Sequence, residues 1–106
     1  MKVYEYTTFK NEKVIEVIVS ENTVMINHMI LPEGDRLPVH TANSNVYMVV
    51  VQGEVTLELD GSQPVSYGKG SIINIDFGTL MNVYNAGEAT LELFVVKAPG
   101  PGAYKA

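Results

Sequence analysis

His40 is the residue of this sequence whose type and surroundings best fit acid–base chemistry, because an imidazole both accepts and donates protons near neutral pH. Glu33 and Asp35 lie on the turn that leads to it, and a carboxylate can orient an imidazole. Asp76 ends an apolar run just before Gly78, so it either caps that turn or, if buried at a cavity, acts as a base. His40 and Asp76 are the candidate catalytic residues, whereas Glu33 and Asp35 are more simply interpreted as solvated turn residues.

The methionines are a second group of residues whose side chains could take part in chemistry. The chain has five of them, and a set of thioethers with an imidazole favours Cu(I) over harder metal ions. The simpler interpretation is that flexible methionine side chains fill irregular space in a core. The Cu(I) hypothesis would use His40, Met48, Met81 and one of Met25 and Met29.

Composition excludes several other classes of function. The absence of cysteine excludes disulfides, zinc–thiolate sites, iron–sulfur clusters and thiol catalysis. Lys and Arg number 7 against 12 Asp and Glu, so a basic footprint for nucleic acid or an anionic membrane is missing. The longest apolar run, residues 46–51, is too short to cross a bilayer, and residues 1–5 lack the apolar core of a secretory signal. We therefore expect a soluble cytoplasmic protein.

Short apolar and alternating runs dominate the sequence. Residues 55–59 alternate apolar and polar side chains, as a half-buried strand does, and turn residues separate such runs. No window of helical length has the spacing of an amphipathic helix. This pattern predicts an all-β sandwich or barrel, and the length predicts a single domain, 1–106. The expected strands cover residues 14–19, 24–31, 46–51, 55–59, 72–77, 80–84 and 91–96.

Two spaced groups of residues resemble the sequence motifs of the cupin family. In the first group Gly34 is followed after five residues by His40, and Gly53 lies thirteen residues further on. The second group consists of Gly70, Asp76-Phe77-Gly78, Met81 and Asn85. The resemblance covers roughly residues 22–97 and is to small single-domain bacterial cupins, which implies a double-stranded β-helix, or jelly-roll barrel. The motif glycines are expected at corners between the sheets, where positive φ or close backbone approach is needed.

The metal-binding positions of the motifs are mostly lost. In metal-binding cupins the motifs supply three histidines and a glutamate to one ion, and the matching positions here are His40, Ala42, Val46 and Met81. The proline of the second motif is replaced by Asp76. One imidazole does not hold a divalent ion that prefers three or four nitrogen or oxygen ligands. We expect no metal or other cofactor of the usual cupin type, and the chemistry of metal-dependent cupins loses its basis.

Strand alternation then predicts what lines the barrel instead. If His40 faces inward, every second residue along its strand and the neighbouring strands does so too, and His28 faces outward. This gives a narrow apolar pocket in which Asn27 and His40 are the polar groups. The predicted pocket residues are Met25, Asn27, Met29, His40, Ala42, Val46, Met48, Met81, Val83 and Leu93.

The N-terminal run 2–9 alternates and lies outside both motifs, so we expect residues 2–19 to cover a sheet edge, either in the same chain or in a second subunit. The prediction is a C₂ homodimer, with the tail 98–106 as a surface strap. The candidate interface residues are Tyr4, Tyr6, Phe9, Val14 and Ile18.

Three functional hypotheses follow from these features. The first is a metal-free binding or accessory protein that takes a small, largely apolar ligand in the pocket. The second is a small acid–base enzyme, isomerase- or lyase-like, that uses His40 with Asn27 or Asp76. The third is the Cu(I) site formed by His40 and the methionines.

Overall fold

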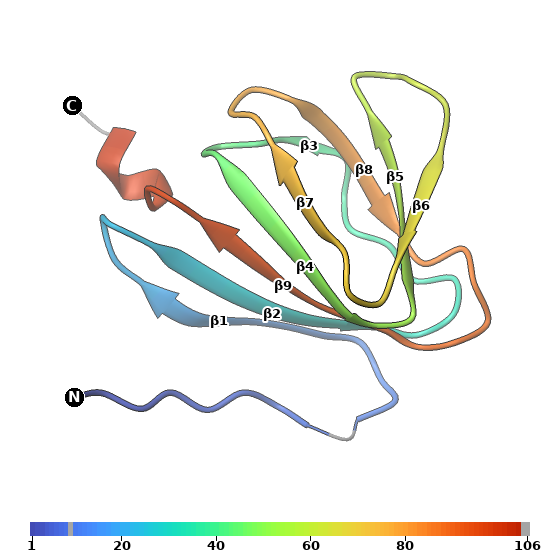
Figure 1. Cartoon of the computed structure of the whole chain (residues 1–106), viewed down its shortest axis with the longest axis horizontal. Helices are drawn as coiled ribbons and strands as arrows, with labels where there is room; N and C mark the ends of the chain where they lie inside the picture. Colours follow the sequence, from blue (N-terminus) through green and yellow to red (C-terminus); the bar gives the residue numbers. More distant parts are fainter. Residues whose placement is uncertain (9, 105–106) are drawn as a thin grey trace.

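The computed structural model describes residues 1–8 and 10–104, and in them the chain forms two antiparallel sheets (Figure 1). One sheet has the strand order β1-β2-β9-β4-β7 and the other β3-β8-β5-β6. The predicted all-β fold is therefore confirmed. Among these residues no helix is long and apolar enough to cross a membrane. The elements are β1 (Val14–Ser20), β2 (Met25–Leu31), β3 (His40–Thr41), β4 (Val46–Gln52), β5 (Glu54–Leu59), β6 (Val65–Gly68), β7 (Ile72–Ile75), β8 (Leu80–Tyr84), β9 (Leu91–Lys97) and the 3₁₀ helix η1 (Pro101–Tyr104).

The core lies between the two sheets and follows the alternation of the sequence. On β4 the side chains of Val46, Met48 and Val50 are buried, whereas Tyr47 points outward and is exposed. Side chains that face each other from the two sheets complete one apolar cluster. The β-branched residues of these runs fit such a half-buried pleated surface well. Its buried members include Met29, Leu31, Val55, Leu57, Met81, Val83, Leu91, Leu93 and Val95.

The motif glycines have the positive φ angles expected at corners of the fold. Gly53 joins β4 of one sheet to β5 of the other with a φ of 74°. A Cβ atom there would lie 2.5 Å from the carbonyl oxygen of Thr90, closer than real contacts allow. Only glycine fits this crossing between the sheets.

The two ends of the chain differ in how they meet the sheets. Residues 2–8 were expected to form a strand, but they have no strand pairing in the described part of the chain, and Phe9 lies outside it. They instead form an extended segment beyond β1 that is attached through side chains (Figure 1). At the other end, Gly100 donates its N–H to the carbonyl of Asn22, 3.0 Å away, and the hydroxyl of Ser44 donates to the carbonyl of Pro99. The tail is therefore held at the β1–β2 turn through Gly100 and at the loop before β4 through Pro99.

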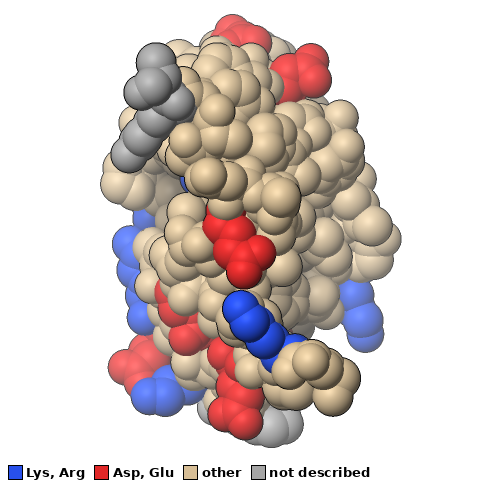
Figure 2. Space-filling model, turned by 90° about the vertical axis from the view of Figure 1, so that its left-hand side faces the viewer, with Lys and Arg blue, Asp and Glu red and all other residues tan. Residues whose placement is uncertain are grey.

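Charges are mixed on the side of the molecule that lies at the left of Figure 1. Figure 2 shows acidic side chains between lysines and arginines there, set among uncharged residues. The described residues form no continuous basic surface on that face.

Candidate functional site

A cavity of about 50 Å³ lies inside the barrel, at the place where the family resemblance puts the pocket. The alternation of β2, β4 and β8 brings many of the predicted pocket residues to it. Ala42 and Leu93 are buried in the neighbouring core, and the half-buried Met25, at the beginning of β2, is not among the lining residues. The cavity is lined by Asn27, Met29, Leu37, His40, Asn43, Val46, Met48, Met81, Val83, Val95 and Lys97.

Side chains fill most of the barrel. The thioethers of Met29, Met48 and Met81 are almost wholly buried, with exposed fractions of 7%, 1% and 4%. A space of about 50 Å³ has room for roughly three or four water molecules, far less than the several hundred Å³ of a pocket for a drug-sized ligand. Only a very small ligand fits this cavity without movement of the methionines.

Two polar groups predicted from the sequence lie at this cavity. His40 is exposed, and its Nδ1 is 2.8 Å from the carbonyl oxygen of Pro38. Because a carbonyl only accepts, Nδ1 carries the hydrogen, and Nε2 of the neutral ring is an acceptor. Asn27 is 9% exposed, and its Oδ1 is buried with no hydrogen-bond partner among the described residues. A buried acceptor without a donor is rare and destabilising.

Sequence reasoning missed Lys97 and Asn43. The Nζ of Lys97 donates to Oδ1 of Asn43 over 2.9 Å, and both residues line the cavity. Partial burial lowers the pKa of the Lys97 amine, because desolvation disfavours its charged form. The signal was available, since Lys97 follows Val95 at the next inward position of β9.

The structure places Asp76, the second candidate catalytic residue, outside the cavity. β7 ends at Ile75, whose side chain is buried, so Asp76 begins the turn and lies exposed, away from the cavity lining. Its contribution to the turn is a backbone carbonyl that accepts the N–H of Thr79 at 3.2 Å. The side chain that accepts a turn N–H here is Asp60, whose Oδ1 is 2.9 Å from the N of Leu80. Without burial, Asp76 lacks the environment that would make it a base.

The residues present do not fit the metal centre of other cupins. Ala42 and Val46 stand at two ligand positions, are 2% and 0% exposed, and belong to the apolar core. Met81 offers a thioether where a histidine would lie. In residues 1–8 and 10–104 no group of three His, Cys, Asp or Glu side chains is placed to hold a metal ion. A hard divalent ion therefore lacks its ligands at this site.

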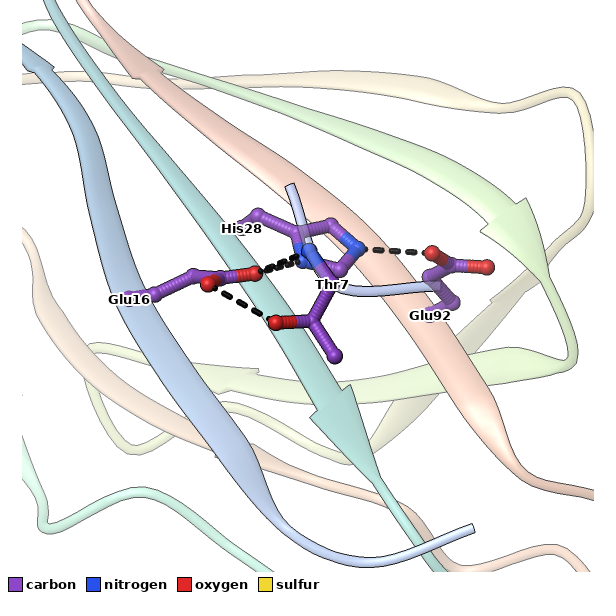
Figure 3. Close-up of polar contacts among 4 residues, drawn as sticks. All are labelled: Thr7, Glu16, His28 and Glu92. Carbon is purple, nitrogen blue, oxygen red and sulfur yellow. Dashed lines mark hydrogen bonds and ion pairs between the residues drawn. The ribbon is translucent and has the colours of Figure 1, made fainter. Parts of the chain in front are cut away.

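A second cluster of ionisable groups lies outside the barrel (Figure 3). His28 of β2 points to the outer face of its sheet, as alternation predicts, yet it is 0% exposed. Its Nδ1 is 2.7 Å from Oε2 of Glu16 on β1, and its Nε2 is 2.6 Å from Oε2 of Glu92 on β9. The imidazole thus bridges the two neighbouring strands, with one carboxylate at each ring nitrogen.

The N-terminal segment covers this cluster. Thr7 donates to the Glu16 carboxylate twice, from its backbone N over 2.8 Å and from its hydroxyl over 3.0 Å. The Thr7 N–H, and next to it the His28 contact, hold the pKa of Glu16 below its usual value despite some desolvation. The ring of Tyr6 packs 4.6 Å from that of His28 and 4.9 Å from that of Phe94. No local sequence pattern predicts this cluster, because His28 and Glu92 are 64 positions apart.

Comparison with known proteins agrees with this fold. No family model matches the chain. An uncharacterised protein of Methanocaldococcus jannaschii is 41% identical over 100 residues, which cover 94% of this chain and 86% of the relative. The crystal structure of that protein, described as an RmlC-like cupin family protein with a double-stranded β-helix fold, matches with a TM-score of 0.96 and 40% identity over 100% of this chain and 97% of the other.

More distant structures share the fold alone. An RmlC-like cupin protein from Desulfovibrio desulfuricans has a TM-score of 0.77 and 22% identity, over 93% of this chain and 97% of that one. The archaeal relative is similar enough in sequence and structure to establish the family. This chain therefore belongs to the RmlC-like cupin family and has the double-stranded β-helix fold that its two sequence motifs implied.

Proposed function

We propose that this cupin is a binding or accessory protein that holds one small molecule in its barrel and uses no metal centre of the usual cupin type. The observation that carries the proposal is the buried Oδ1 of Asn27, an acceptor without a donor in a residue that lines the cavity. A bound molecule with an N–H or O–H group would satisfy this atom once the Asn27 amide turns toward the cavity, since the oxygen has almost no accessible surface of its own. Ligand sites combine apolar walls with a few such polar groups.

The methionine lining supports the same proposal. Met29, Met48 and Met81 surround a space that is small but bordered by side chains with several rotatable bonds. Such walls adapt to a ligand somewhat larger than the empty cavity. The exposed ring of His40 lies at the same cavity, so the ligand would have polar contacts as well as apolar ones.

Methyl NMR of the methionines tests the proposal with a control inside the chain. In a protein labelled with ¹³C at the methionine methyl groups, small organic molecules that enter the barrel should shift the signals of Met29, Met48 and Met81. The signals of Met1 and Met25, which do not line the cavity, should stay in place. A library of such molecules that shifts none of the three lining methyl groups would contradict the proposal.

A second candidate is the binding of Cu(I). The observation in its favour is that three thioethers, Met29, Met48 and Met81, line one cavity with His40. The Nδ1 of His40 donates to a backbone carbonyl, the arrangement that commonly fixes a metal-binding histidine with its other nitrogen toward the ion. Such a set of sulfur and nitrogen donors suits Cu(I).

Titration with Cu(I) against a coloured chelator tests this candidate. One ion per subunit should be taken up by the wild type and lost on Met81→Leu. Met25→Leu is the matched control and should retain the ion, because Met25 does not line the cavity. Retention by the Met81 variant, or no uptake by the wild type, would eliminate the Cu(I) role.

We also propose that two copies of this chain associate through the outer face of the five-stranded sheet. On this face Tyr47 and Ile72 are 39% and 67% exposed, and in the N-terminal segment Tyr4 and Tyr6 are 46% and 45% exposed. A second copy would bury this apolar surface in an isologous interface. Light scattering at micromolar concentration should give twice the subunit mass; a monomer would contradict the dimer.

A further inference from the structure

The lining of the barrel cavity has a positive charge without a negative one. Lys97 contributes an ammonium group, and its partner is the neutral amide of Asn43. None of the described residues that line the cavity is acidic. A partly buried cation is stabilised by an anion, and burial has already lowered the pKa of this amine. The charge at this site is therefore complementary to an anionic ligand.

Asn27, whose amide oxygen is unpaired, is a diagonal neighbour of Lys97 in the sheet. Asn27 of β2 is opposite Val95 of β9, and Lys97 is two residues further along the same strand. Such diagonal neighbours point to the same side of a sheet with about 7–8 Å between them. With the Asn27 amide turned toward the cavity, its oxygen and the amine of Lys97 would contact two adjacent groups of one small molecule. One group would be an anion and the other a hydrogen-bond donor.

The size of the cavity limits the rest of the ligand. A space of about 50 Å³ holds roughly the volume of three or four waters, so it takes a chain of two or three carbons. Its inner wall is apolar, formed by Val46, Met48, Met81 and Val83. A methyl or ethyl group fits this wall better than a further charged group.

We propose that the barrel binds a short-chain 2-hydroxy carboxylate. The carboxylate contacts the ammonium of Lys97, the hydroxyl donates to Oδ1 of Asn27, and the alkyl end lies against the methionines. This inference rests on the proposed function, since it names the ligand class of the same cavity.

Three probes of the same carbon number separate the parts of this proposal. Lactate has the carboxylate and the hydroxyl, propionate has only the carboxylate, and 1-propanol has only a hydroxyl. We expect lactate to bind about fivefold more tightly than propionate, as one neutral hydrogen bond allows. Propionate should bind at least about tenfold more tightly than 1-propanol, as a charged contact allows. Affinities come from titrations that follow the methyl signals of Met29, Met48 and Met81.

Two substitutions assign the contacts. Lys97→Met, which keeps an unbranched side chain without the charge, should remove the preference for propionate over 1-propanol and should weaken lactate binding by a similar factor. Lys69→Met, in the exposed turn between β6 and β7, is the control and should leave all three affinities unchanged. Asn27→Leu should remove the preference for lactate over propionate and keep the preference for propionate over 1-propanol. Methyl spectra of each variant without ligand report whether it is folded.

The possible failures are distinguishable. Equal affinity for the three probes, with shifts at the lining methionines, would overturn the carboxylate inference and leave the binding proposal standing. Lactate binding that survives Lys97→Met unchanged would also overturn it. If none of the three probes shifts the lining methyl groups at tens of millimolar, the inference fails. The proposed function then fails only if the wider library of small molecules leaves these groups unshifted as well.

Discussion

The barrel and the cluster on the outer face of the sheet each contain one of the two histidines. Apolar packing dominates the first region, and contacts between ionisable side chains dominate the second. Apolar side chains fill the barrel, and His40, the histidine of the first cupin motif, borders its cavity with an exposed ring whose Nδ1 donates to the carbonyl of Pro38. Outside, His28 belongs to no motif, yet it is fully buried and both ring nitrogens contact carboxylates. The histidine that matches the family pattern is therefore the less constrained one.

The comparison separates two kinds of structural role. In a metal-binding cupin the motif residues contribute donors to an ion, whereas here most of them have become part of an apolar core. The ionic contacts of this protein instead join β1, β2 and β9 and hold the N-terminal segment on them (Figure 3). Stability inside should depend on volume, and stability outside on charge. Substitutions in the two regions should therefore respond differently to pH and salt.

The largest effect is expected from a cavity inside the barrel. Met48 is 1% exposed, and Met48→Ala removes packed atoms that the neighbouring side chains replace only in part. The free energy of unfolding should fall by about 3–4 kcal/mol, within the range for large-to-small changes in cores. Urea denaturation should give the same loss at pH 7 and pH 5 and at low and high salt. A loss that varies with salt would contradict the assignment of this region to packing alone.

Loss of the buried imidazole should come next. His28→Ala removes the imidazole that lies between the carboxylates of Glu16 and Glu92 and contacts both of them. The free energy of unfolding should fall by about 3 kcal/mol at neutral pH, the lower end of the range for breaking a buried ion pair, because both carboxylates are partly exposed. Denaturation of His40→Ala is the matched control and should change by less than about 0.5 kcal/mol. Equal effects of the two substitutions would remove the distinction between the histidines.

The two regions also differ in how far the sequence predicts them. Alternation along β2, β4 and β8 depends on each strand alone, so it was enough to bring Asn27, Met29 and Met81 to one cavity. The same alternation reaches Lys97, but a lysine at the end of an apolar strand is ordinarily read as its solvated end. The outer cluster depends on which strands are neighbours, and the pairing of β2 with β9 is not encoded in either strand by itself.

The N-terminal segment is a further case in which local pattern was insufficient. Its alternation of apolar and polar residues is that of a strand, and a strand was expected at residues 2–9. In the described part of the segment, the backbone N–H of Thr7 donates to the side-chain carboxylate of Glu16 and not to a backbone carbonyl of the neighbouring strand. A carboxylate of β1 has taken the place of a backbone acceptor. Side-chain competition of this kind is invisible to periodicity.

The pH dependence of stability tests the role of the Glu16 carboxylate in the outer cluster. The pKa of Glu16 is lowered in the folded protein, mainly by the Thr7 N–H, so its contribution to stability is complete above the unfolded pKa of about 4.3. That contribution is lost as the pH falls through the folded pKa. The free energy of unfolding should therefore decrease less steeply between pH 5 and pH 3 in Glu16→Gln than in the wild type. Glu33→Gln, at an exposed turn, is the control and should keep the wild-type slope; a Glu16 variant with that same slope would contradict the role of this carboxylate.

The smallest effect is expected at the contact between the segment and the cluster. Thr7→Val keeps the size of the side chain and the backbone N–H bond to Glu16 but removes the hydroxyl bond of 3.0 Å. The segment should open more often while the sheets stay folded, because one hydrogen bond to a charged acceptor, partly exposed, contributes about 1 kcal/mol. Amide hydrogen exchange of residue 7 should become about fivefold faster, whereas exchange in β4 should not change. Thr8→Val, which changes an exposed neighbour, should leave residue 7 as protected as in the wild type. Equal exchange rates of residue 7 in Thr7→Val and Thr8→Val would show that the Thr7 hydroxyl does not hold the segment. The backbone N–H bond to Glu16 would then hold it alone.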